Sequence, residues 1–169
     1  FDINVNLNKD HSVARNVVAM IEGSDPLLKD EFIVIGAHYD HLGLGGFGSG
    51  SRIPDTVAVH YGADDNASGV AGIVELAKYF SDKNIELKRS LLFISFDAEE
   101  MGLLGSRYFI NNPLIELKKI VAMINFDMIG RLNDNNAITI GGTGTSLETE
   151  LILNQLSSTS PLKLSYSSE

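Results

Sequence analysis

Phe32-Ile33-Val34-Ile35-Gly36-Ala37-His38 is an apolar run that ends at a histidine. Two later runs end in the same way, because residues 91–96 lead into Asp97 and residues 120–126 lead into Asp127. Short apolar runs bounded by polar turns are typical of fully buried strands in a parallel sheet. Since ligands bind outside the carboxyl ends of such strands, the sequence predicts an imidazole and several carboxylates at one edge.

A segment between the first two strands adds acids to that edge. Residues 62–69 read Gly-Ala-Asp-Asp-Asn-Ala-Ser-Gly and open a helical pattern with one apolar face. Seven carboxylates would then crowd one rim: Asp40, Asp64, Asp65, Asp97, Glu99, Glu100 and Asp127. Two such charges about 4 Å apart repel by about 4 kcal/mol at an effective dielectric of about 20. Protons or divalent cations must therefore neutralise the rim, and His38 favours cations.

Strand and helix patterns alternate along the chain, which predicts a mixed α/β sheet that is parallel at its centre and flanked by helices. We expect strands at 1–8, 15–22, 32–38, 90–97, 120–127 and 137–141, and helices at 67–82, 103–111 and 145–158. The first two strands are interpreted as an antiparallel edge hairpin, and the tail from Leu162 begins another alternating strand. Length and uniform composition predict a single domain, 1–169.

Composition and charge exclude several classes of partner. A net charge of -9 argues against a nucleic-acid backbone or an anionic membrane surface. No apolar stretch is long enough for membrane insertion, and residues 1–5 alternate instead of forming a leader. The chain has no cysteine, so any metal must use imidazole and carboxylate.

His38 is the first candidate metal ligand, and Asp40 lies close enough in sequence to orient its ring through the second nitrogen. The alternative is a buried histidine at a strand end with Asp40 as a turn residue. His41 competes for the ligand role but follows the expected turn. His11 and His60 are assigned to surface or loop packing.

The acid pairs have ordinary explanations as well as catalytic ones. Asp64 and Asp65 could simply cap a helix, but adjacent acids also suit a carboxylate that bridges two metals. Glu99 and Glu100 could simply occupy a first helical turn, or one could bind metal while the other acts as general base. Asp127 could be a turn residue.

The glycine-rich loop between Tyr39 and Asp64 is either an active-site loop or, over 43–52, a disordered insertion.

Four ordered motifs carry a resemblance to a known family. Gly36-Ala37-His38-Tyr39-Asp40, residues 62–69, residues 98–106 (Ala-Glu-Glu-Met-Gly-Leu-Leu-Gly-Ser) and Asn125-Phe126-Asp127-Met128 together resemble metallopeptidase family twenty-eight, the co-catalytic zinc aminopeptidases. The resemblance covers most of residues 15–135. It implies the three-layer sandwich of the zinc aminopeptidases and phosphorylases.

The resemblance also implies a role for each site residue. The zinc ligands would be His38, a bridging Asp65, Glu100 and Asp127, with Glu99 as general base and Asp40 orienting His38. The family's last ligand is a histidine, and this chain has none after His60. We therefore expect a chain that lacks its carboxyl-terminal part, is nearly inactive, and holds one zinc or none where the complete enzyme holds two.

The implied activity is hydrolysis of amino-terminal peptide bonds by metal-activated water, with peptide or protein amino termini as substrates. Three alternatives remain open: a glutaminyl cyclase, a carboxypeptidase of the same clan with Arg131 as the basic residue, and a non-catalytic interaction domain. The resemblance suggests a secreted or periplasmic protein. Side-chain preference and oligomeric state have no signal in the sequence.

Overall fold

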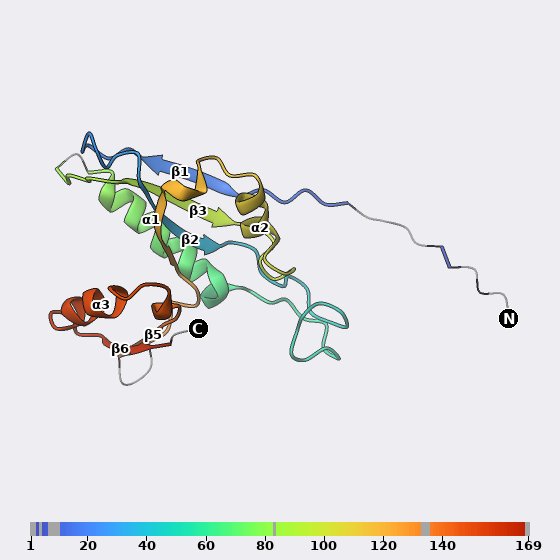
Figure 1. Cartoon of the computed structure of the whole chain (residues 1–169). Coiled ribbons are helices and arrows are strands. Elements are labelled where there is room, and N and C mark those ends of the chain that lie inside the picture. The colour runs from blue at the N-terminus through green and yellow to red at the C-terminus, as the bar shows by residue number, and fades with distance from the viewer. Residues whose placement is uncertain (1–2, 4, 7–10, 83, 133–135, 168–169) are drawn as a thin grey trace. The chain divides into compact units, whose positions relative to one another are not determined.

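The computed structural model describes residues 3, 5, 6, 11–82, 84–132 and 136–167 (Figure 1). The chain divides into two compact units, Phe1–Met128 and Ile129–Glu169. The single domain expected from the sequence stays a prediction. Among the described residues, no helix combines the length and the apolar character that a membrane span requires.

The first unit is built on a four-stranded sheet with the strand order β1-β3-β2-β4. Its strands are β1 (Val17–Ile21), β2 (Phe32–His38), β3 (Ser90–Phe96) and β4 (Ile120–Asn125). β2 pairs in parallel with both β3 and β4, and β1 pairs antiparallel with β3. The prediction of a sheet with a parallel centre and an antiparallel edge is confirmed.

The antiparallel edge has a different partner from the one expected. β1 pairs with β3, whereas the sequence predicted a hairpin between 1–8 and 15–22. Residues 3, 5 and 6 are described and lie in no strand, while the rest of 1–8 lies outside the described residues.

Two apolar clusters cover the two faces of β2 and β3, because successive side chains of a strand point to opposite faces. On one face, Phe109 of α2 (Leu104–Asn111) packs with Val34, Leu92 and Ile94. On the other, Ile73 of α1 (Gly69–Phe80) packs with Ile35, Ala37, Leu91 and Phe93. Burial of each large apolar side chain contributes roughly 1.5–3 kcal/mol. This double core fixes the loops at the carboxyl ends of both strands, and its helix, sheet and helix layers are the predicted sandwich.

β4 differs from the buried strand that its apolar sequence predicted. Val121, Met123 and Ile124 are each about half exposed, at 49%, 51% and 49%. The physical reason is position, because β4 is the last strand of the described sheet and pairs there only with β2. An apolar run therefore predicted the strand correctly but overestimated its burial.

The second unit is a small parallel pair with a helix. β5 (Ala137–Ile140) pairs with β6 (Lys163–Tyr166), and α3 (Thr149–Ser157) lies between them in sequence after a short turn, η3 (Thr143–Thr145). Strands were predicted in both places. The helix begins at Thr149 instead of residue 145, because residues 143–145 form that separate turn.

Candidate metal centre

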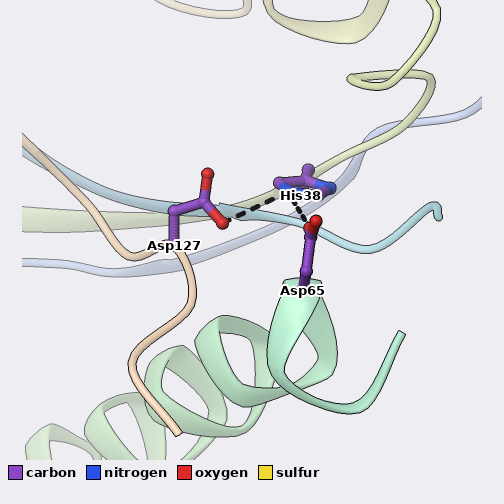
Figure 2. Close-up of side chains that lie close together, drawn as sticks. All are labelled: His38, Asp65 and Asp127. Carbon is purple, nitrogen blue, oxygen red and sulfur yellow. Dashed lines mark ion pairs between the residues drawn. The ribbon is translucent and has the colours of Figure 1, made fainter. Parts of the chain in front are cut away.

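The predicted ligands converge at the carboxyl edge of the sheet in the first unit. His38 is the last residue of β2, Asp127 follows β4, and Asp65 lies in η1 (Ala63–Ser68), the turn that precedes α1. Figure 2 shows these three side chains pointing toward one another. His38 is buried, with 3% of its surface exposed, so its ring is held by the core while the carboxylates face it from the rim.

Three carboxylates surround one nitrogen of His38. Its Nε2 lies 3.3 Å from Oδ1 of Asp65, 3.5 Å from Oδ1 of Asp127 and 4.0 Å from Oε2 of Glu99. His38, Asp65 and Asp127 each offer a ligand atom within 4.8 Å of the others. One imidazole and two carboxylates with converging oxygens are a donor set that suits zinc.

Asp65 also belongs to a second group of potential ligands, with His41 and Glu100. Nδ1 of His41 lies 2.7 Å from Oε1 of Glu100 and 3.8 Å from Oδ1 of Asp65. Sequence reasoning gave His41 less weight because it follows the strand. The turn after His38 nevertheless returns this ring to the site.

Asp40 organises the site mainly through the loop after β3. Its carboxylate accepts hydrogen bonds from the main-chain amides of Glu99, at 2.9 Å, and Glu100, at 3.1 Å. Nδ1 of His38 lies 3.1 Å from the main-chain oxygen of Asp40 and 3.7 Å from its carboxylate. The closer contact with the ring therefore comes from the backbone of Asp40.

Asn66 was missed by sequence reasoning, although it holds the site together. Its side chain is buried, donates to the main-chain oxygen of Phe126 at 2.9 Å, and accepts from the amides of Gly69 and Met128. Gly69 must lack a side chain, because a Cβ there would collide with the Asn66 amide. The peptide bond between Asp65 and Asn66 is cis. Only the run of small and polar residues at 62–69 hinted at such a tight structure.

The remaining candidates are members of neither ligand group. Asp97 accepts hydrogen bonds from the amides of Arg15 and Ala98, which is a structural role. Nε2 of His60 lies 3.1 Å from the Ser51 hydroxyl, and His11 is exposed. Asp64 is bonded within its own turn to Ser68. Arg131 belongs to the second unit.

Two pKa shifts report the excess of negative charge at the edge. Burial lowers the pKa of His38, but the main-chain bond to Asp40 and the charges of Asp127, Glu99 and Asp40 outweigh it, so the pKa is raised. Burial raises the pKa of Glu99, and the charges of Glu100, Asp127 and Asp40 add to this against the opposing effect of His38. Both shifts favour proton uptake, and a cation would relieve the same repulsion.

A small cavity opens beside the first ligand group. It has a volume of about 150 Å³, and its lining includes His38, Glu99, Asp127 and Leu103. A larger cavity of about 490 Å³ is lined by residues of β1 and α2, such as Val18 and Tyr108, and by none of the candidate ligands. Candidate ligands therefore line the smaller cavity and not the larger one.

Curated relatives of this chain include leucine aminopeptidases. Leucine aminopeptidase 2 of Trichophyton rubrum is 35% identical over 127 residues, which are 75% of this chain and 22% of that protein. Leupeptin-inactivating enzyme 1 of Streptomyces exfoliatus is 34% identical over 119 residues, 70% of this chain and 23% of that protein. The chain spans less than a quarter of the length of these relatives.

Solved structures share the fold. A Zn-dependent exopeptidase from Parabacteroides distasonis matches with a TM-score of 0.64 and 20% identity, over 91% of this chain and 56% of the other. Glutaminyl cyclase from Porphyromonas gingivalis matches with a TM-score of 0.66 and 22% identity, also over 91% and 56%. The sequence model of peptidase family M28 matches residues 16–163. This match, over most of the residues that build the sheet and its acidic edge, shows that the chain belongs to peptidase family M28.

Proposed function

We propose that this chain carries the zinc-binding edge of an aminopeptidase, which hydrolyses the amino-terminal bond of peptides. The observation that supports it most is the convergence of Asp65 and Asp127 on Nε2 of His38, with Glu99 at 4.0 Å. His38, Asp65 and Asp127 would hold one zinc, and Glu100 with Asp65 would contribute to a second. When bound there, zinc would act as a Lewis acid that polarises the scissile carbonyl and acidifies water.

Glu99 is the proposed general base. It lies at the cavity with His38 and Asp127 but belongs to neither ligand group, so its carboxylate is left to take a proton from water and return it to the leaving amine. The Asp40 carboxylate would position this base by accepting hydrogen bonds from the main-chain amides of Glu99 and Glu100. The main-chain oxygen of Asp40 would hold the His38 ring.

The negative charge at the carboxyl edge of the sheet supports a substrate with a free amino terminus. The free ammonium group of a peptide is attracted to an edge that carries Asp65, Glu99, Glu100 and Asp127. The two proteins named above, a leucine aminopeptidase and a leupeptin-inactivating enzyme, agree with peptides as substrates. Substrate, activity and metal number for the whole protein are part of this proposal.

Glutaminyl cyclase is the second candidate, favoured by the structural match at 22% identity, which concerns the fold. By the family resemblance such enzymes work at a single metal, whereas Asp65 here takes part in two ligand groups. A carboxypeptidase would need a basic residue for the substrate carboxylate. A non-catalytic domain would be expected to have lost the base or a ligand, and the chain retains Glu99, Glu100 and Asp127.

The proposal is tested on the natural protein that carries this chain, because the chain spans less than a quarter of the length of the relatives that it matches. For the same reason we expect little turnover from the 169-residue chain alone. The assay is release of the chromophore from amino-acid anilides, with and without a chelator. Cyclisation of an amino-terminal glutamine without anilide hydrolysis would favour the cyclase.

The substitution Glu99→Gln tests whether Glu99 acts as the general base or as a metal ligand. We expect it to lower kcat by at least about 100-fold while zinc content, measured by elemental analysis, is retained. Glu75→Gln is the matched control, because Glu75 lies on the exposed surface of α1, and it should leave both quantities unchanged. Loss of zinc together with turnover would make Glu99 a ligand, and unchanged turnover would exclude it as the base.

A further inference from the structure

The side chain of Asn16 holds both ends of the loop that carries Glu99. This loop leaves β3 at Asp97 and reaches α2 at Gly105. Oδ1 of Asn16 accepts a hydrogen bond from the Asp97 amide at 3.1 Å, and its Nδ2 donates to the main-chain oxygen of Gly105 at 2.8 Å. The Gly105 amide in turn donates to the main-chain oxygen of Asp97 at 3.0 Å. These three bonds form a closed ring at the base of the loop.

The register of β1 brings Asn16 to this position. Val17, the first residue of β1, pairs with Ser95 of β3, so the chain just before β1 runs antiparallel past the end of β3 (Figure 1). Gly105 is buried in the first turn of α2, where an added Cβ would collide with Oδ1 of Asn16 and with the main chain of Asp97. The absence of a side chain at Gly105 therefore permits the close approach on which the ring depends.

The loop has a conformation that needs support from outside. Ala98 and Leu103 have positive φ angles of 53° and 61°, which side chains other than glycine rarely adopt. Such residues persist where the surrounding structure imposes their conformation. The Asp40 carboxylate supports the loop near its middle by accepting the Glu99 amide at 2.9 Å. Asn16 supports the loop at its base, and the two supports come from different segments of the chain.

We infer that Asn16 is a positioning residue for Glu99. By closing the base of the loop, it keeps the Glu99 carboxylate 4.0 Å from Nε2 of His38. The inference rests on the proposed role of Glu99 as general base and deepens it. It adds to the site a residue that lies outside all four sequence motifs. If Asn16 only anchored the edge strand, its loss would lower stability and leave the rate of the reaction unchanged.

Steady-state kinetics of the natural protein test this difference. Asn16→Ala should lower kcat by about 10–100-fold, because a base displaced by about 1 Å can cost about 100-fold in rate. KM should stay unchanged, because the interaction that is lost acts in the transition state and not on bound substrate. Unchanged kcat in Asn16→Ala would overturn the inference.

Val18→Ala is the matched control for stability. Val18 lies on the same strand, packs against the apolar cluster that contains Phe109, and takes no part in the three bonds. This variant should lose stability in urea but keep its kcat at a temperature at which both variants are folded. An equal loss of kcat in Val18→Ala and Asn16→Ala would mean that Asn16 has only a structural role.

Hydrogen exchange of the metal-free protein, followed by mass spectrometry, tests the loop without reference to turnover. Amides of the peptide 97–105 should exchange at least about 10-fold faster in Asn16→Ala, because the loss of a hydrogen bond of typical net strength changes an opening equilibrium by about that factor. Val18→Ala should leave exchange in this peptide unchanged. Exchange that is no faster in Asn16→Ala than in wild type would overturn the inference.

The double variant of Asn16→Ala with Glu99→Gln tests whether the effect passes through Glu99. Asn16→Ala should lower kcat no further once Glu99 is replaced, because the two residues then act as one unit. A further loss of the same size would show that Asn16 acts by another route, and the inference would be wrong. Unchanged turnover in Glu99→Gln alone would instead overturn the proposed base, while the exchange rates would still decide whether Asn16 holds the loop.

Discussion

Asn66 donates a hydrogen bond from its side-chain amide to the main-chain oxygen of Phe126, 2.9 Å away. Its side-chain oxygen accepts from the amides of Gly69, at 3.0 Å, and Met128, at 3.2 Å. One buried side chain thus joins the start of α1, next to Asp65, to the segment on both sides of Asp127. Two ligands from distant parts of the sequence are held in register by this residue.

Asn66→Ala should therefore damage both the fold and the metal centre. It leaves up to three main-chain groups without their partner, and we expect the free energy of unfolding to fall by about 2–4 kcal/mol, since each unsatisfied buried group costs about 1–3 kcal/mol. Zinc binding at the His38 group should weaken as Asp127 loses its support. Urea unfolding and zinc titration of the 169-residue chain measure the two effects.

Asn112→Ala is the control for this substitution, because Asn112 is exposed and its amide bonds only within its own helix end, to Tyr108. It should cost less than about 0.5 kcal/mol. If Asn66→Ala and Asn112→Ala were equally stable and bound zinc equally well, the joining role of Asn66 would be wrong.

Asp40→Asn tests how Asp40 acts. An asparagine can still accept one of the two amide bonds from Glu99 and Glu100, but its NH₂ group would face the other amide, donor against donor. The main-chain contact with His38 should survive. We expect kcat of the natural protein to fall more than its zinc affinity, because the base is displaced while the ring keeps its support.

Exposed Asp55 provides the matched control, and Asp55→Asn should change neither kcat nor zinc affinity. Anilide turnover and zinc titration are measured on each variant. An Asp40→Asn protein that loses zinc but keeps its kcat when zinc is in excess would show instead that the carboxylate acts through the His38 ring.

Residues at strand ends were predictable, because an apolar run reports both the strand and where it stops. His38, Glu99 and Asp127 all follow such runs, and topology then places them at one edge. Burial was harder to predict, as β4 shows, because the same apolar sequence can lie at the sheet's centre or at its edge.

His41 and Asn66 could not be predicted because their places depend on how turns fold. The alternation of side chains along a strand does not predict the position of a residue three places beyond His38. The His41 ring lies at the carboxyl edge of the sheet because of its loop contacts with His60 and Gly62. The choice of Asp65 over Asp64 came from the family resemblance. In the structure it is Asp65 that faces both histidines.

Asp97 should make stability depend on pH. Partial burial raises the pKa of its carboxyl, but hydrogen bonds from the Arg15 amide, the Tyr39 hydroxyl and the Ala98 amide outweigh this, so the pKa is lowered from its ordinary 3.8. A group with a lowered pKa in the folded state stabilises the protein above its unfolded pKa, and this contribution is lost as the pH falls through the folded pKa.

Asp97→Asn should therefore lower the free energy of unfolding by about 1–2 kcal/mol at pH 5 to 7, and the difference from wild type should shrink below about pH 4. Urea unfolding across this range measures it, with the exposed Asp55→Asn protein expected to match wild type throughout. A difference that stayed constant down to about pH 2.5 would mean that the hydrogen-bond geometry of Asp97, and not its charge, provides the stabilisation.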